Sequence, residues 1–114
     1  MKKFIIIYHA PVAAMQQTMS PTPEQMAKGM ELWKSWAMKC GNKLLDLGSP
    51  LKNGQVIDTK GQVKNSDSQM TGYSILSAED FEEIKVLLDG HPHLTWHPDC
   101  SIEVYELAPM PGMK

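Results

Sequence analysis

The chain has no arginine: all 11 of its basic residues are lysine, set against 13 acidic residues. Arginine carries the planar guanidinium that grips phosphates and guanine edges through two hydrogen bonds at once. Together with the formal net charge of −2, this absence argues against nucleic acid as a partner. It also argues against tight binding of carboxylate or phosphate substrates, because a lysine or a helix N-terminus would have to hold such a group.

Cysteine is scarce as well, with Cys40 and Cys100 far apart and no C-x-x-C spacing. This pattern favours free thiols in a reducing compartment. Long apolar runs are also missing. The run over residues 4–8 stops at His9 and Pro11, short of the ~7–15 residues of a secretory signal core and the ~20 of a membrane span. We therefore expect a cytoplasmic protein without a membrane partner.

What is present fits one globular domain, with 114 residues of which 42% are hydrophobic and 21% charged. A chain of this length can hold one core without metal or disulfide cross-links. We expect a single domain over residues 1–108. Residues 109–114, which include two prolines and a glycine, are expected to form a loose tail.

The first part of the chain predicts a strand, a loop and a long helix. Residues 4–8 are aromatic or β-branched, as in a central strand, and the loop at 10–21 is long enough to form a lid or a pocket wall. Thr22, Pro23 and Gln25 then give the capping-box pattern. This pattern predicts a helix that ends near Cys40 and carries a broad apolar stripe.

The rest of the chain predicts a strand at 44–47, a hairpin around Gly61 and a strand at 73–76. A second helix, capped by residues 77–80 and ended by Gly90 and Pro92, and a last strand at 101–107 follow. This order matches the β-α-β-β-α-β arrangement of a ferredoxin-like α+β fold, with both helices on one face of an antiparallel sheet. The strands supply more apolar side chains than one buried face needs. A second copy packed sheet to sheet would cover the other face, so we expect a homodimer.

Four blocks of the sequence resemble the YCII-related protein family, and together they extend over nearly the whole chain. They are MKKFIIIY at 1–8, GYSIL at 72–76 with AED at 78–80, GHPHL at 90–94, and SIEVYEL at 101–107 with PMP at 109–111. The resemblance implies a dimeric α/β barrel in which ferredoxin-like protomers pack their sheets together. It also implies a small pocket between each sheet and its neighbouring helix and loops.

The resemblance implies less about function. A few members of the family look like enzymes on small aromatic-derived acids, a dehydrochlorinase among them, with a histidine near the start of the first helix and an aspartate as the acid–base pair. This chain has Glu24 and Gln25 at the comparable positions and no histidine between Pro23 and Cys40. That chemistry is therefore not expected here.

Three of the four histidines lie within residues 91–97. If residues 94–97 are extended, His93 and His97 lie about 13 Å apart, too far to share a metal with bonds of ~2 Å. We expect neither a metal site nor a cofactor. His97 and Asp99 would form an imidazole–carboxylate pair suited to general-base work; alternatively, Asp99 begins the turn before the last strand.

His9 closes the first strand beside the long loop, where small ligands are often held. Trp33 and Trp36 lie ~60° apart on the first helix, so both belong to the core or one of them walls a pocket. The candidate ligand-pocket residues are therefore His9, Trp33, Trp36, His97 and Asp99.

Three functions remain open from the sequence. The first is a homodimer that binds a small, partly apolar organic molecule between the sheet and the first helix. The second is an enzyme that uses His9 or His97 as a general acid or base on an enolisable or halogenated acid. The third is a structural accessory dimer without a ligand.

Overall fold

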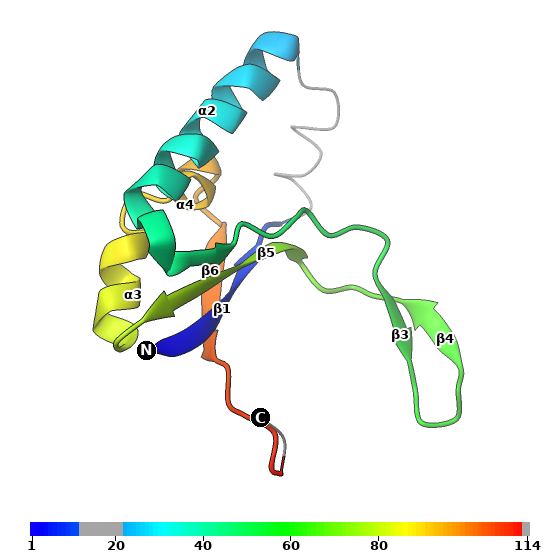
Figure 1. The fold of residues 1–114 in the computed structure, drawn as a ribbon. Coiled ribbons are helices and arrows are strands. Elements are labelled where there is room, and N and C mark those ends of the chain that lie inside the picture. The colour runs from blue at the N-terminus through cyan, green and yellow to red at the C-terminus, as the bar shows by residue number, and fades with distance from the viewer. Residues whose placement is uncertain (12–21, 113–114) are drawn as a thin grey trace.

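The computed structural model describes residues 1–11 and 22–112 of the chain (Figure 1). The predicted loop at 10–21 therefore lies almost wholly outside the described residues. The elements are β1 (Lys2–His9), α2 (Pro23–Cys40), a 3₁₀ turn (Gly41–Lys43), β2 (Leu44–Asp46), β3 (Gln55–Ile57), β4 (Val63–Asn65), β5 (Met70–Ala78), α3 (Phe81–Leu88), α4 (Pro92–Trp96) and β6 (Ser101–Glu106).

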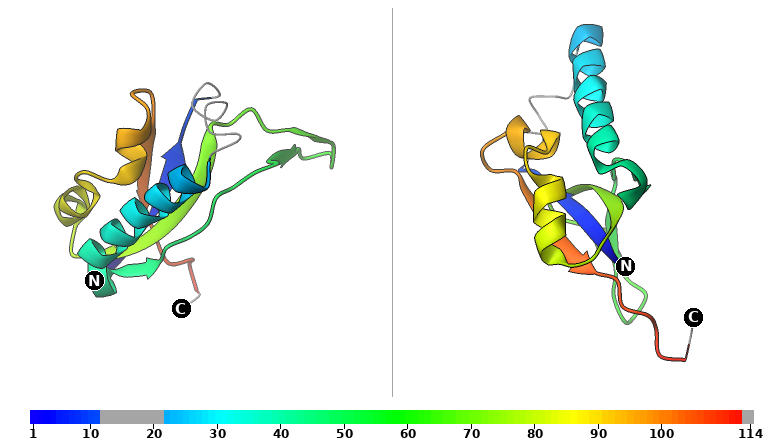
Figure 2. Two further views of the ribbon diagram at one scale, coloured as in Figure 1. Left: turned by 90° about the horizontal axis from the view of Figure 1, so that it is seen from above. Right: turned by 60° about the vertical axis from the view of Figure 1, so that its left-hand side comes forward.

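Four strands form an antiparallel sheet in the order β2-β5-β1-β6, and α2, α3 and α4 lie on one side of it (Figures 1 and 2). This arrangement confirms the predicted ferredoxin-like α+β fold. The predicted hairpin is also present, as β3 and β4 pair in a separate two-stranded sheet between β2 and β5 in the sequence. Gly61 in its turn has a φ of 80°, a conformation that glycine adopts without strain.

The core lies between the sheet and the helices. Along β1 the side chains of Phe4, Ile6 and Tyr8 are buried, and along β5 those of Ser74 and Leu76 are buried. The residues between them are only half-buried. Because successive strand residues point to opposite faces, this alternation places the buried set on the helix side of the sheet.

No helix or strand of residues 1–11 and 22–112 covers the opposite face of the sheet (Figure 2). Ile5 lies across from Ile75, and Ile7 lies across from Tyr73. On the other side of β1, Tyr105 lies across from Ile5 and remains 52% exposed. These five residues form what we call the open face, and their apolar character agrees with the sequence argument for a second copy.

Helix α2 starts where the capping box predicts. The Thr22 side chain accepts a hydrogen bond from the Gln25 backbone N–H, and the Gln25 side chain accepts one from the Thr22 N–H. The predicted apolar stripe packs only in its second half. Met26 and Met30 are each 55% exposed, because an 18-residue helix is about 27 Å long and α2 runs past the end of the sheet (Figure 1).

The geometry assumed for residues 94–97 is wrong, since Leu94, Thr95 and Trp96 belong to α4 and are not extended. Pro92 stands in the first turn of α4, where its fixed φ and missing N–H suit a helix start. The His91 side chain caps this helix by accepting a hydrogen bond from the His93 N–H at 2.9 Å. None of the helices in the described residues has both the length and the apolar character needed to cross a membrane.

Candidate functional site

Five rings meet between α2 and the sheet, and we call this group the aromatic cluster: Tyr8 from β1, Trp33 and Trp36 from α2, His91 before α4, and His93 within it. His91 is central, with ring centroids 4.3 Å from Trp36 and 4.7 Å from Trp33, both edge to face. Tyr8 lies 5.3 Å from Trp33 and 5.0 Å from His91. Such edge-to-face packing favours one fixed arrangement of the rings.

A directed chain of hydrogen bonds runs through this cluster. The Nδ1 atom of His91 accepts from the His93 N–H, so the neutral ring carries its proton on Nε2. That Nε2–H donates to the Tyr8 hydroxyl at 3.2 Å, and the hydroxyl donates to Ser74 Oγ at 2.7 Å. Ser74 in turn donates to the Leu47 carbonyl at 2.7 Å. Every polar side-chain atom in this series of hydrogen bonds is therefore paired with a neighbour.

Burial keeps the cluster uncharged. It lowers the pKa of His91 to about 3, and the nearby His93 and Lys39 add to the effect. Burial likewise raises the pKa of Tyr8 far above its ordinary value, against the opposing effect of the hydrogen bond to Ser74. At neutral pH the imidazole is neutral and the phenol is protonated. Neither group can exchange a proton with a substrate near neutrality.

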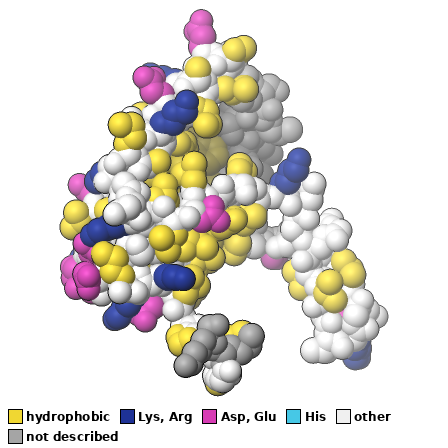
Figure 3. Space-filling model, viewed as in Figure 1, with side chains coloured by type: hydrophobic (Ala, Val, Ile, Leu, Met, Phe, Trp, Pro, Cys, Tyr) yellow, Lys and Arg dark blue, Asp and Glu magenta, His cyan; other side chains and the backbone are white. Residues whose placement is uncertain are grey.

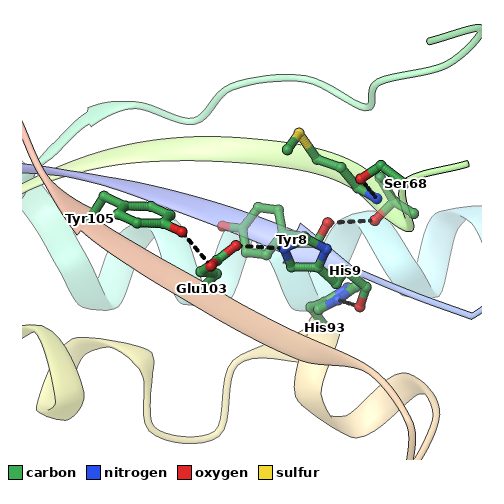
Figure 4. A network of polar contacts seen from close by, with 8 residues as sticks. Tyr8, His9, Ser68, His93, Glu103 and Tyr105 are labelled. Carbon is green, nitrogen blue, oxygen red and sulfur yellow. Dashed lines mark hydrogen bonds and ion pairs between the residues drawn. The ribbon is translucent and has the colours of Figure 1, made fainter. Parts of the chain in front are cut away.

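His93 ties the cluster to the end of β1. Its Nε2–H donates to the His9 carbonyl at 2.7 Å (Figure 4). Burial lowers the pKa of His93, although backbone hydrogen bonds to His9 and Ser101 oppose the shift. Trp96 packs beside His93 with ring centroids 5.9 Å apart. All three tryptophans of the chain thus lie in the cluster or at its border.

The two predicted helix residues differ in their exposure. Trp36 is 4% exposed and donates its indole N–H to the Leu87 carbonyl at 2.9 Å, which links α2 to α3. Trp33 is only partly buried. It lies about one helical turn before Trp36, on the side of the exposed Met30. Trp33 is therefore the cluster ring that a molecule in solution would meet first.

His9 lies on the other face of the sheet, away from Trp33. Its Nε2 is 3.0 Å from Glu103 Oε1, and Tyr105 donates its hydroxyl to Glu103 Oε2 at 2.5 Å (Figure 4). These hydrogen bonds lower the pKa of Glu103, with Tyr105 contributing most and His9 next. The pKa of Tyr105 is raised by the same carboxylate. An imidazole oriented by a carboxylate is a geometry suited to general-base work.

His97 and Asp99 lie together in the turn between α4 and β6, but their side chains do not form the predicted pair. The Nδ1 atom of His97 accepts from the backbone N–H of Asp99 at 3.1 Å, and the Cys100 N–H donates to the His97 carbonyl. This is the turn geometry that the sequence left as the alternative. The structure thus brings Trp33 and Trp36 together and places His9 and the 97–99 turn apart from them.

Sequence reasoning did not assign Tyr8, Ser74, His91 or His93 to a site. The alternation of β1 contains a signal for Tyr8, because it shares a face with Phe4 and Ile6. The proximity of residue 91 to the first helix depends on the path from α3 to α4, which leaves no local pattern. Within the described part of the chain, no three His, Cys, Asp or Glu side chains are grouped closely enough to hold a metal ion.

No protein-family model matches the chain, and no curated protein matches it. Among solved structures, the chain is similar to 5-chloro-2-hydroxyhydroquinone dehydrochlorinase (TftG) from Burkholderia phenoliruptrix AC1100, in complex with 2,5-dihydroxybenzoquinone. The two share 14% sequence identity over 100% of each chain, with a TM-score of 0.57. The likeness is one of fold, and it extends over the whole chain.

Proposed function

We propose that this protein is a cytoplasmic, homodimeric member of the YCII-related family that binds a small planar organic molecule at the aromatic cluster. The observation that carries the proposal is a wall of three rings, Tyr8, Trp33 and His91, that is uncharged at neutral pH and has one partly exposed member. Aromatic faces and edges bind flat rings of similar size.

The chemistry of the surroundings supports an aromatic or quinone-like ligand over a strongly anionic one. From Trp33 the apolar stripe of α2 continues through the exposed Met30 and Met26, whose flexible thioethers adapt to irregular apolar shapes. The chain has no arginine to pair with a phosphate or a carboxylate. The structurally similar dehydrochlorinase was solved with 2,5-dihydroxybenzoquinone, which is a small planar ring of the proposed class.

Calorimetric titration with hydroquinone and with 2,5-dihydroxybenzoquinone tests the proposal. The wild-type protein should bind at least one of them, and Trp33→Leu should bind it roughly 2- to 13-fold more weakly, as expected for loss of an aromatic contact of about 0.5–1.5 kcal/mol. Met38→Ala is the matched control, because Met38 is on the same helix and 82% exposed. It should bind like the wild type.

Unchanged affinity in a folded Trp33→Leu variant would place the ligand elsewhere. No binding of either compound at millimolar concentration would favour the third possibility, a structural dimer without a ligand.

A second candidate function is acid–base catalysis, and the His9–Glu103 pair is the observation that favours it. In this role the imidazole takes a proton from an enolisable acid while Glu103 stabilises the imidazolium that forms. His97 lacks a comparable carboxylate partner in the described turn. If His9 acts in this way, His9→Gln should abolish turnover of an enolisable or halogenated acid, and Glu103→Gln should lower it.

The homodimer is supported by the open face. Ile5, Ile7, Tyr73, Ile75 and Tyr105 form a contiguous apolar set across three strands, and sheet faces of this kind are normally covered. Packing against the same face of a second copy about a two-fold axis would cover both faces at once. Sedimentation of the wild-type protein at micromolar concentration should give twice the protomer mass.

A further inference from the structure

The hairpin formed by β3 and β4 projects away from the helices and stands clear of the four-stranded sheet (Figures 1 and 2). Within the part of the chain that the structure describes, these strands pair with each other and with no other strand. They are joined by three residue pairs. A two-stranded hairpin of this kind is only marginally stable in water without a third strand or a packing surface.

One face of this hairpin carries an apolar pair near the turn, whereas Gln55 and Asn65 pair on the same face at the base. Ile57 lies directly across from Val63, and the two side chains are 70% and 56% exposed. The other face carries Val56 across from Lys64. The turn between the strands is polar and is closed by Asp58, whose carboxylate accepts from the backbone N–H groups of Lys60 and Gln62. The apolar residues therefore lie along the strands and not at the tip.

The protomer as a whole is more extended than a compact monomer. Its radius of gyration is 15.9 Å, whereas about 13 Å is expected for a compact chain of this length. Its accessible surface is 8544 Å², against about 6,300 Å² expected for a monomer of this mass. The excess is larger than the ~800 Å² that each partner buries in a standard interface.

The hairpin adjoins the Met70 end of the sheet and encloses space beside it. A hollow of about 740 Å³ at the base of the hairpin is lined by residues that include Leu51, Gln55 and Met70. Met70 pairs with His9 at the end of β1, so the hollow reaches the sheet itself. In the space-filling view, hydrophobic side chains gather on the main body and also on the hairpin at the right, with a gap between the two (Figure 3).

We infer that the hairpin, residues 55–65, is an arm that clasps a second copy of this chain, with Ile57 and Val63 against the partner's surface. The inference rests on the proposed homodimer and extends it, because a dimer formed through the open faces alone would leave the arm in solvent. The second copy is the occupant that fits the shape, since it arrives beside the arm when the open faces meet and brings apolar surface of the same kind.

The dimer dissociation constant, measured by sedimentation velocity or mass photometry, tests the inference. Ile57→Asp should raise it at least tenfold, because a carboxylate would then be buried in an apolar contact. Val56→Asp places the same side chain on the other face of the same strand, next to Lys64. This matched control should leave the dissociation constant within about twofold of the wild type.

The outcomes separate the two claims. A monomeric wild type at micromolar concentration would overturn both the homodimer and the clasping arm. A wild-type dimer that Ile57→Asp does not weaken, or that Val56→Asp weakens equally, would overturn the arm alone.

Hydrogen exchange of the unmutated protein gives a readout that needs no variant. The Asp58 N–H donates to the Gln62 carbonyl across the hairpin. It should exchange more slowly above the dimer dissociation constant than below it. Exchange that does not depend on protein concentration would count against the arm.

Discussion

At the residue scale, His91 explains how the space between α2 and the sheet is filled. It is fully buried, both ring nitrogens are hydrogen bonded, and it touches both tryptophans of α2. A charged imidazole would lose hydration there without gaining a counter-ion, so the ring stays neutral. The cluster is held by its hydrogen bonds and packing, which a flat ligand at its outer edge need not disturb.

This burial predicts how stability depends on pH. The pKa of His91 falls from the usual 6.5 to about 3 on folding, so between these values the unfolded chain binds a proton that the native protein does not. Stability should be complete above pH 6.5 and should decrease as the pH falls towards 3. For one group the slope approaches 1.4 kcal/mol per pH unit. Urea unfolding at pH 7.0, 6.0 and 5.5 measures it.

The matched variants for this measurement are His91→Gln and His97→Gln. His91→Gln removes the buried imidazole and should reduce the slope between pH 7.0 and 5.5 to the part contributed by His93, whose pKa burial also lowers, while also lowering stability at pH 7. His97 lies in an exposed turn, so His97→Gln should keep most of the slope. Equal slopes in the wild type and His91→Gln would contradict the assignment to His91.

Gly48 and Gly29 predict opposite effects of the same substitution. Gly48 has a φ of 81°, and a Cβ there would lie 1.7 Å from the Tyr73 carbonyl oxygen. Gly48→Ala should therefore destabilise the protein by more than about 3 kcal/mol. Gly29 in α2 has open space around it, and Gly29→Ala should stabilise by about 0.5–1 kcal/mol. Thermal unfolding compares the two, and a stable Gly48→Ala protein would refute the close approach.

At the element scale, α2 consists of two different halves. Its second half is held by Trp36 and Cys40, both buried, while the first half runs past the sheet with Met26 and Met30 exposed. The sequence predicted the start of α2 because the capping box is local. It could not predict where the packing stops, because that depends on the length of the strands beneath the helix.

The capping box should therefore matter most for the first turns of α2. Thr22→Ala removes the side chain that accepts from the Gln25 N–H, which should cost about 1 kcal/mol. Hydrogen exchange should accelerate in the first turns and stay unchanged near Cys40. Ser35→Ala is the control within the same helix, and exchange in its first turns should match the wild type.

At the scale of the whole molecule, the order of helices and strands predicted the ferredoxin-like fold. This order could be read from the sequence because helix caps and apolar strands are local signals. The hairpin was also predicted from Gly61 and its flanking strands. Its projection from the body was not, because the path of residues 47–54 and 66–69 carries no periodic pattern. The sequence also led us to expect His9, Trp33 and His97 around one pocket. That expectation did not take account of the alternation along β1, which turns Tyr8 towards the helices and His9 to the opposite face.

The open face predicts the effect of a charge placed on it. Tyr105→Asp adds a second carboxylate to this face, next to Glu103, which lies across from Ile7. It also removes the hydroxyl that donates to Glu103, so two neighbouring like charges should weaken the dimer at least tenfold. Lys85→Asp lies on α3, on the helix side of the sheet, and should leave the dimer intact. A Tyr105→Asp protein with the wild-type mass and dissociation constant would show that the dimer uses another surface.

The most direct test of ligand binding at the aromatic cluster is an NMR titration of the three indole N–H signals with hydroquinone. Trp33 is the partly buried ring, and Trp36 is held to the Leu87 carbonyl. We expect a saturable shift that is largest for Trp33 and smaller for Trp36 and Trp96. In Trp33→Leu the shifts of the remaining two signals should need more hydroquinone to saturate. Indole signals that stay fixed while backbone signals of the open face move would contradict it.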